Sequence, residues 1–203
     1  MREATLSSNL PKCGFEGFLV LDEMKIKEDL IIKKYKGSIE LVGFVELPEP
    51  LKHFEAHKRN TNAQELASNV LQFVFLGHTG FRFPIANFAT TTAKASELYM
   101  YVHSTIQKLV FYGFKVTAVI MDGGVQNRDF AKMHFQGHPL DAQWFFTPPY
   151  AQSSQIAFVQ DISHNIKKIR NSLLKSGMAT WHSRKITVDG SLVCWRHFTD
   201  AVH

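Results

Sequence analysis

Residues 93–124, AKASELYMYVHSTIQKLVFYGFKVTAVIMDGG, contain the strongest helix pattern of the chain, followed at once by a strand pattern. The apolar residues Leu98, Val102, Ile106 and Leu109 recur at helical spacing. They would share one face of a helix over 93–112, so this segment is predicted to be an amphipathic helix packed on a core.

The ends of this helix also carry recognisable signals. Thr91 or Thr92 is predicted to cap its start, and Gly113 stands where helices commonly end in a left-handed glycine. Residues 115–121 are apolar and β-branched, which predicts a strand, and Asp122 follows at its end before two glycines. The stretch therefore predicts a helix-to-strand unit that delivers a carboxylate to the edge of a sheet.

Other segments extend the pattern in both directions. Residues 17–22 form an apolar run too short to favour a helix, and are predicted as a buried strand ending in Asp22. A glycine turn at 36–38 separates two β-rich runs, which predicts a hairpin. The predicted elements are strands at 17–22, 70–76, 83–88, 115–121 and 156–160, hairpins at 30–47 and 185–192, helices at 93–112, 127–136 and 163–175, and a loop at 48–62.

The order of these elements indicates the fold class. Three strand regions precede an alternation of helix and strand, which favours an α/β domain with a mixed sheet flanked by helices. Residues 1–13 are predicted to be a disordered leader and 14–176 the core domain, with 177–203 as a separate tail. We find no internal repeat and no low-complexity tract.

Composition narrows the class of protein. The 203 residues are 45% hydrophobic with 17 Phe, enough for one well-filled core. A net charge of +5 is compatible with a nucleic-acid partner, although charge alone is weak evidence. Two cysteines do not make a disulfide framework, and no segment approaches the roughly 20 apolar residues of a membrane span. A nuclear or cytoplasmic protein that is neither secreted nor membrane-bound is expected.

Asp22 and Asp122 are the first candidate functional residues. Both end predicted strands, and ligands gather at strand ends in open α/β sheets. If the two strands are neighbours, the carboxylates form a hard-oxygen site suited to Mg²⁺, which supports in-line displacement at phosphorus. The alternative is structural, because Asp before Gly-Gly is a common turn and a strand-end acid is often a helix cap.

Asp161 is a third strand-end acid and a weaker candidate metal ligand. It directly precedes the predicted helix at 163–175, so an N-cap role is favoured. That helix is basic, and its cationic side chains either contact DNA phosphates or form a solvated face. The candidates for DNA contact are Lys167, Lys168, Arg170 and Asn171, together with Arg128 in the preceding predicted helix.

Several blocks, in order, resemble P-element-type transposases and their THAP-domain-linked relatives. The first is Asp22-Glu23-Met24, and the strands that follow are similar to those of the family. Asp122-Gly123-Gly124 with Asn127-Arg128 resembles a later block, and Asp161 with His164 begins the next. The resemblance runs from about residue 17 to 171, and the ordered series of blocks carries more weight than any one of them.

The resemblance implies a ribonuclease H-like fold and a DDE-type mechanism. It implies Asp22 and Asp122 as metal ligands, Mg²⁺ or Mn²⁺ as cofactor, transposon-end DNA as partner and a homo-oligomer in the full-length family. The block around Asp161, including His164, is assigned to structure and DNA contact and not to chemistry. GTP is bound in the family by an inserted domain that is expected to be absent here or only begun at 177–203.

The sequence also departs from the family. A DDE site needs a third acid, a Glu that the family reaches only after the inserted domain, and no Glu follows Asp161. The THAP zinc module has no counterpart, because Cys13 and Cys194 lack paired spacing. The expected function is therefore an incomplete transposase core that is inactive by itself. The alternative is a non-catalytic, domesticated DNA-binding or interaction protein that keeps the fold.

Three weaker hypotheses complete the survey. A different ribonuclease H-fold enzyme, either a nuclease or an actin-like phosphotransferase, is a third alternative, although a second glycine-rich phosphate loop is missing. His53 with His57, and His134 with His138, have the i,i+4 spacing of zinc ligands but no convincing third ligand. The aromatic residues 144–146 are able to stack on bases, but packing is favoured.

Overall fold

The structure is a computed structural model that describes residues 10–35, 37–47, 65–135, 145–151, 154–177 and 183–201. The chain divides into two compact units, Met1–Val159 and Gln160–His203, and each is described by itself. Of the predicted leader 1–13, only residues 10–13 are described. The short 3₁₀ helix η1 (Lys12–Phe15) begins within this leader. The predicted loop at 48–62 lies outside the described residues.

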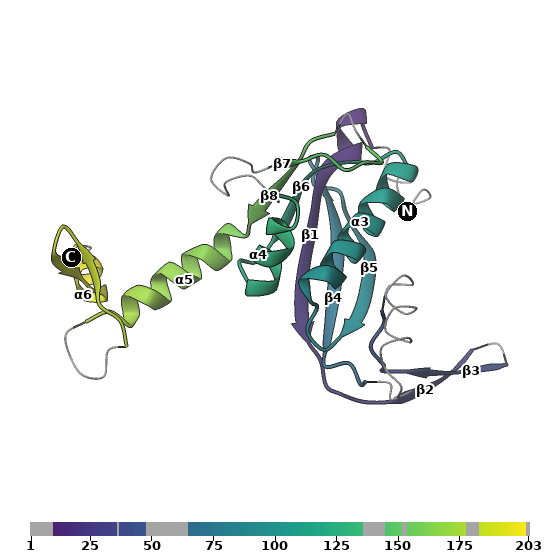
Figure 1. Ribbon diagram of the computed structural model, residues 1–203, viewed down its shortest axis with the longest axis horizontal. Coiled ribbons are helices and arrows are strands. Elements are labelled where there is room, and N and C mark those ends of the chain that lie inside the picture. Colours follow the sequence, from purple (N-terminus) through teal and green to yellow (C-terminus); the bar gives the residue numbers. More distant parts are fainter. Residues whose placement is uncertain are drawn as a thin grey trace. The chain divides into compact units, whose positions relative to one another are not determined.

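A six-stranded mixed sheet, in the order β5-β4-β1-β6-β8-β7, organises the first unit (Figure 1). Its strands are β1 (Glu16–Lys25), β4 (Asn69–Gly77), β5 (Arg82–Thr90), β6 (Lys115–Met121), β7 (Phe145–Phe146) and β8 (Ile156–Gln160). β1 pairs antiparallel with β4 and parallel with β6, which confirms the predicted mixed α/β class. The two-residue strand β7 was not predicted, because so short a run carries no periodicity.

The predicted hairpin at 30–47 forms a separate two-stranded sheet. Its strands are β2 (Ile31–Tyr35) and β3 (Ser38–Val42), joined through Gly37 at φ 86°. Figure 1 shows this ribbon extending away from the six-stranded sheet. The hairpin is thus an insertion in the sequence between β1 and β4, which are neighbours in the six-stranded sheet.

Helix α3 (Ala95–Phe111) covers one face of the sheet, as the predicted apolar stripe requires (Figure 1). Leu98, Val102, Ile106 and Leu109 are all at most 2% exposed, and Gly113 adopts φ 84° after the helix end, as predicted. The predicted cap at Thr91 or Thr92 is wrong. The helix begins after Lys94, whose N–H donates to the Glu97 carboxylate at 3.0 Å, because that acid satisfies a first-turn donor from inside the helix.

The sheet buries every second residue against this helix. Leu19 and Leu21 of β1 and Val119 and Met121 of β6 belong to the same buried cluster as the α3 stripe. Phe73 is fully buried in β4 beside them. The strand residues between these positions therefore lie on the opposite face, since successive side chains alternate in a strand.

Helix α4 (Val125–Lys132) starts two residues earlier than predicted and ends before residue 136. Gly124 occupies its N-cap position, so the helix begins immediately after β6 and its short turn. The early start places Asn127 and Arg128 in the first turn of the helix, where they face back towards the turn at 122–124.

The second unit consists of α5 (Ile162–Leu174), the hairpin β9 (Ile186–Val188) and β10 (Ser191–Val193), and the short helix α6 (Trp195–Thr199). Buried Ser176 joins the end of α5 to the hairpin, because its hydroxyl donates to Val193 O at 2.6 Å and accepts from Ile186 N at 2.9 Å. These contacts group α5 with the tail, whereas the sequence predicted a boundary after residue 176.

The burial of β4 predicts that replacing two phenylalanines lowers the free energy of unfolding by very different amounts. Phe73→Ala removes a fully buried ring beside α3, and we expect a loss of about 3–5 kcal/mol in the free energy of unfolding. Phe111→Ala removes a ring that is 83% exposed on the same unit and should change it by less than about 0.5 kcal/mol. Urea unfolding followed by circular dichroism measures both; equal effects would contradict the assigned core.

Candidate metal site and its surroundings

The two candidate carboxylates lie on neighbouring parallel strands at the same level. In the β1–β6 register Val20 pairs with Ile120, and each aspartate follows two residues later. Both alternate with core residues, Asp22 with Leu21 and Asp122 with Met121, so both side chains belong to the sheet face opposite α3. The predicted adjacency is therefore observed, while the metal-ligand role stays a prediction.

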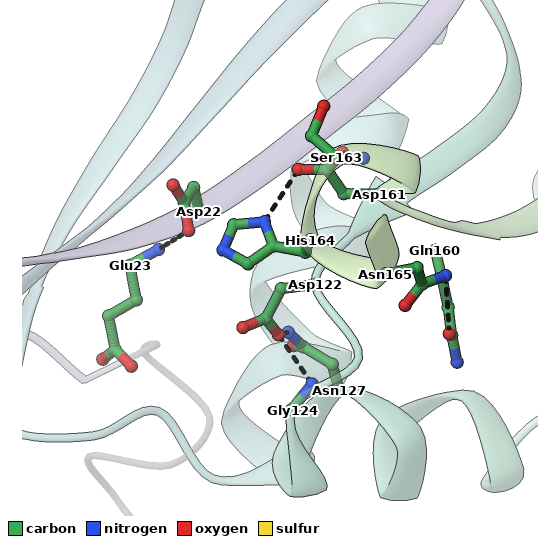
Figure 2. Close-up of polar contacts among 10 residues, drawn as sticks. All are labelled: Asp22, Glu23, Asp122, Gly124, Asn127, Gln160, Asp161, Ser163, His164 and Asn165. Atoms are coloured by element: carbon green, nitrogen blue, oxygen red, sulfur yellow. Dashed lines mark hydrogen bonds and ion pairs between the residues drawn. The ribbon is translucent and has the colours of Figure 1, made fainter. Parts of the chain in front are cut away.

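Each carboxylate is held through one oxygen. Asp122 Oδ1 accepts hydrogen bonds from Gly124 N at 2.8 Å and from Asn127 Nδ2 at 2.5 Å (Figure 2). Asp22 Oδ1 accepts from Glu23 N at 2.9 Å. No hydrogen bond to the Oδ2 atom of either residue is found among the described residues, so one oxygen of each remains to meet a cation.

The turn after β6 is built around Asp122. Besides its contacts to Gly124 and Asn127, the turn is held by Arg128, whose Nη1 donates to Gly123 O. Arg128 was predicted as a DNA contact; its guanidinium has this local partner, and the DNA role stays a prediction. The structural alternative for Asp122, a turn acid, is thus also realised, and the two roles use different oxygens.

The neighbouring Glu23 has a different task. It follows Asp22 in β1 and so points to the α3 side of the sheet. Its Oε1 accepts from Thr90 Oγ1 at 2.7 Å and from Ala93 N at 3.2 Å. This carboxylate ties the end of β5 and the approach to α3 onto β1, and it is a structural member of the Asp22-Glu23-Met24 block.

The side-chain amides of Gln72 and Asn87, which were not predicted as site residues, extend the row of polar groups that Asp22 and Asp122 begin. Asp22 pairs in register with Gln72 of β4, and Gln72 pairs with Asn87 of β5. Paired residues share a face, so these amides lie on the carboxylate face of the sheet. The available signal was a polar residue interrupting each of the apolar runs 70–76 and 83–88.

Asp161, the third candidate acid, belongs to the second unit and acts as a helix cap. Its Oδ1 accepts from Ser163 N at 2.8 Å, which confirms the predicted N-cap of α5. Its Oδ2 pairs with His164 Nδ1 at 2.8 Å (Figure 2). Hydrogen bonds from His164 and from the Ser163 backbone hold the pKa of Asp161 below its usual value. Among the described residues, no group of three His, Cys, Asp or Glu side chains is arranged to hold a metal ion.

The basic side chains predicted to contact DNA are exposed along α5. Lys167 and Lys168 carry no ion pair in the part of the chain that the structure describes, and Arg170 donates only to Asn171 Oδ1, at 3.1 and 3.3 Å. The apolar stripe of the same helix is also exposed, with Ile166 at 60% and Ile169 at 61%. The helix thus presents both charge and apolar surface.

The histidine pairs with zinc-ligand spacing and the two cysteines have the following outcomes. His53, His57 and His138 lie outside the described residues, and His134 contacts His103. Both cysteines are free thiols. None of the described helices is long and apolar enough to cross a membrane.

Comparison with known proteins adds the family. Residues 5–134, more than half of the chain, match the family model described as TNP-like, RNase H N-terminal domain. The chain belongs to this family.

A solved structure shares the fold of this TNP-like domain. The Drosophila P element transposase strand transfer complex aligns with a TM-score of 0.64 and 18% sequence identity, covering 95% of this chain. The chain spans 35% of the length of that transposase chain. No curated protein sequence matches this chain. The ribonuclease H-like fold and the resemblance to P-element-type transposases, both predicted from the sequence, are confirmed.

The cap geometry predicts a pH-dependent contribution to stability. Asp161→Ala removes the acceptor for Ser163 N and should cost about 1 kcal/mol, whereas Asp161→Asn keeps an acceptor and should cost less. Because the folded pKa of Asp161 is lowered, its stabilisation is complete above the unfolded value of about 3.9 and is lost as pH falls through the folded pKa.

Urea unfolding at pH 6 and at progressively lower pH, followed by the helical signal, measures this. The difference between the parent chain and the alanine variant should shrink in acid. A difference that stays constant down to pH 2 would show that the Asp161 charge contributes nothing.

Proposed function

We propose that this chain is the catalytic-core portion of a P-element-like DDE-type DNA transposase, with Asp22 and Asp122 as its first two metal ligands. The observation that carries the proposal is the shared level of the two carboxylates on adjacent parallel strands. The family match supports the same assignment. The partner is DNA, whose phosphodiester is the reacting group in DNA cleavage and strand transfer.

The donor set suits a hard divalent cation. Carboxylate oxygens are the ligands that Mg²⁺ and Mn²⁺ prefer, and Mg²⁺ commonly uses one or two of them together with water and phosphate oxygens. A divalent ion held by Asp22 and Asp122 would neutralise charge on the phosphate oxygens and lower the pKa of an attacking hydroxyl. Two carboxylates without a third acid hold such an ion less firmly than a complete DDE set would.

The chain's own residues prepare the site. Asn127 and the Gly124 N–H hold Asp122 Oδ1, which fixes the direction of the remaining oxygen. The amides of Gln72 and Asn87 continue the polar row across the sheet, where they are suited to donate to phosphate oxygens. A third acid completes a DDE site, and none of the described residues joins these two in a three-ligand group.

The second candidate function is non-catalytic DNA binding by a protein that retains the fold. The exposed cations of α5 favour it, because Lys167, Lys168 and Arg170 lie on one short helix without acidic partners among the described residues. Phosphate contacts by such side chains need no metal.

Substitution of the two aspartates tests the catalytic proposal. Asp22→Asn and Asp122→Asn each remove one anionic ligand, and we expect Mn²⁺ affinity to fall at least about tenfold in each. Electron paramagnetic resonance of free Mn²⁺ measures the binding, and Asp189→Asn in the β9–β10 turn is the matched control. Unchanged Mn²⁺ binding in both site variants would rule out the shared site.

Salt-dependent DNA binding tests the second candidate. Lys167→Ala and Lys168→Ala should each reduce the slope of log K against log salt by about 0.9 if each lysine contacts a phosphate. Lys108→Ala, an exposed lysine on α3, is the control. Fluorescence anisotropy with duplex DNA at several salt concentrations measures the slope; a slope independent of both α5 lysines would exclude them from the interface.

A further inference from the structure

A cavity of about 540 Å³ lies between α3, the end of α4 and the segment around β7, apart from the carboxylates. His103, His134 and Phe146 line its inner part, and Phe146 is only 8% exposed. Exposed residues line its outer part: Phe145, Thr147, Pro149 and Gln155. Its volume falls in the range of small-molecule sites, about 300–1,000 Å³.

A chain of hydrogen bonds fixes the inner histidines. His134 Nδ1 lies 3.0 Å from Phe130 O, and a carbonyl only accepts, so this nitrogen carries the proton. In the neutral ring His134 Nε2 is then an acceptor, and His103 Nε2 donates to it across 2.9 Å. His103 Nδ1 is left as an acceptor for the Tyr150 hydroxyl at 2.9 Å.

These hydrogen bonds use every ring nitrogen of the two histidines, so none is left to bond a ligand. The two rings lie nearly parallel, with ring centroids 5.2 Å apart and an angle of 21° between the planes. Burial, and then the neighbouring His134, lowers the pKa of His103 to about 4, and burial also lowers that of His134. Both rings are therefore neutral near pH 7 and act as flat, uncharged surfaces.

The lining as a whole selects against ions. None of the described residues that line the cavity carries a charge near neutral pH, so a phosphate or carboxylate would find no counter-charge inside. Most of the described residues that line the cavity carry aromatic, imidazole or proline rings, and such rings pack well against a planar group. Gln155 and Thr147 offer donors and acceptors at the mouth, enough to meet the polar edge of such a group.

Phe145 extends this surface outwards. It lies on β7, at the edge of the sheet, and is 55% exposed, whereas Phe146 beside it points inwards. Exposed aromatic rings are the surfaces on which unpaired bases stack in single-strand binding proteins, whatever the base, because every base has a flat π-face.

We infer that this cavity binds one unpaired nucleobase of a DNA strand. The base stacks against the cavity rings and Phe145, and its polar edge meets Gln155 and Thr147. The inference rests on the proposed function only for the choice of DNA as the source of the base. It adds a binding site that is separate from Asp22 and Asp122.

A single-stranded oligonucleotide carrying one 2-aminopurine tests the inference, because stacking on aromatic rings quenches this base. We expect quenching with the parent chain, and an apparent Kd about tenfold weaker in Phe145→Ala. Phe111→Ala removes an even more exposed ring outside the cavity and should leave both quenching and Kd unchanged. Gln155→Leu is the second site variant and should weaken binding while Phe145 is retained.

The outcomes separate this site from the proposed function. Salt-sensitive DNA binding without quenching, or with quenching that ignores Phe145 and Gln155, overturns the cavity and leaves the DNA proposal standing. Failure to bind DNA, combined with 2′-deoxyadenosine shifting the imidazole resonances of His103 and His134, supports the cavity without that proposal. Equal affinity for indole, which lacks the polar edge of a base, also overturns the inference.

Discussion

The parallel pairing of β1 with β6 is the constraint on which the rest of the first unit depends. It joins strands almost a hundred residues apart in the sequence and aligns Leu19 with Val119 and Val20 with Ile120. A slip by one residue would turn Leu21 or Met121 out of the core and an aspartate into it. Burial of the leucine and valine side chains under α3 therefore also sets the level at which the two carboxylates stand.

Asp122 shows how one side chain serves structure and candidate chemistry together. The turn between β6 and α4 leaves the first N–H groups of the helix without partners, and Asp122 Oδ1 accepts one of them. Asn127 adds a second hydrogen bond to the same oxygen. The carboxylate is thereby oriented before any ligand arrives, and the second oxygen keeps its capacity to bind a cation.

Charge is distributed unevenly between the parts of the molecule. The carboxylate face of the sheet carries hard-oxygen and amide groups, α5 carries exposed cations, and the cavity beside β7 carries neither. The three surfaces suit a cation, a phosphate backbone and a neutral ring, respectively. The proposed DNA partner contains both of the last two groups.

Much of the fold was predictable from local patterns in the sequence. The stripe from Leu98 to Leu109 specified α3, and the run 115–121 specified β6 to the residue, because periodicity and β-branching act over a few neighbours. Asp161 was predictable as a cap because an N-cap depends only on the next two or three residues. The ordered blocks also predicted the family, which is confirmed, and they singled out Asp22 and Asp122, whose role as metal ligands stays a prediction.

The tertiary structure alone decided the features that depend on distant pairing. Gln72 and Asn87 join the row of Asp22 only through the register of β4 and β5, and Glu23 lies on the opposite face, where it accepts a hydrogen bond from Thr90. His103 and His134, 31 residues apart, meet only when α3 and α4 pack together. Sequence determines which elements form; which side chains then face one another depends on the long-range register and packing of those elements.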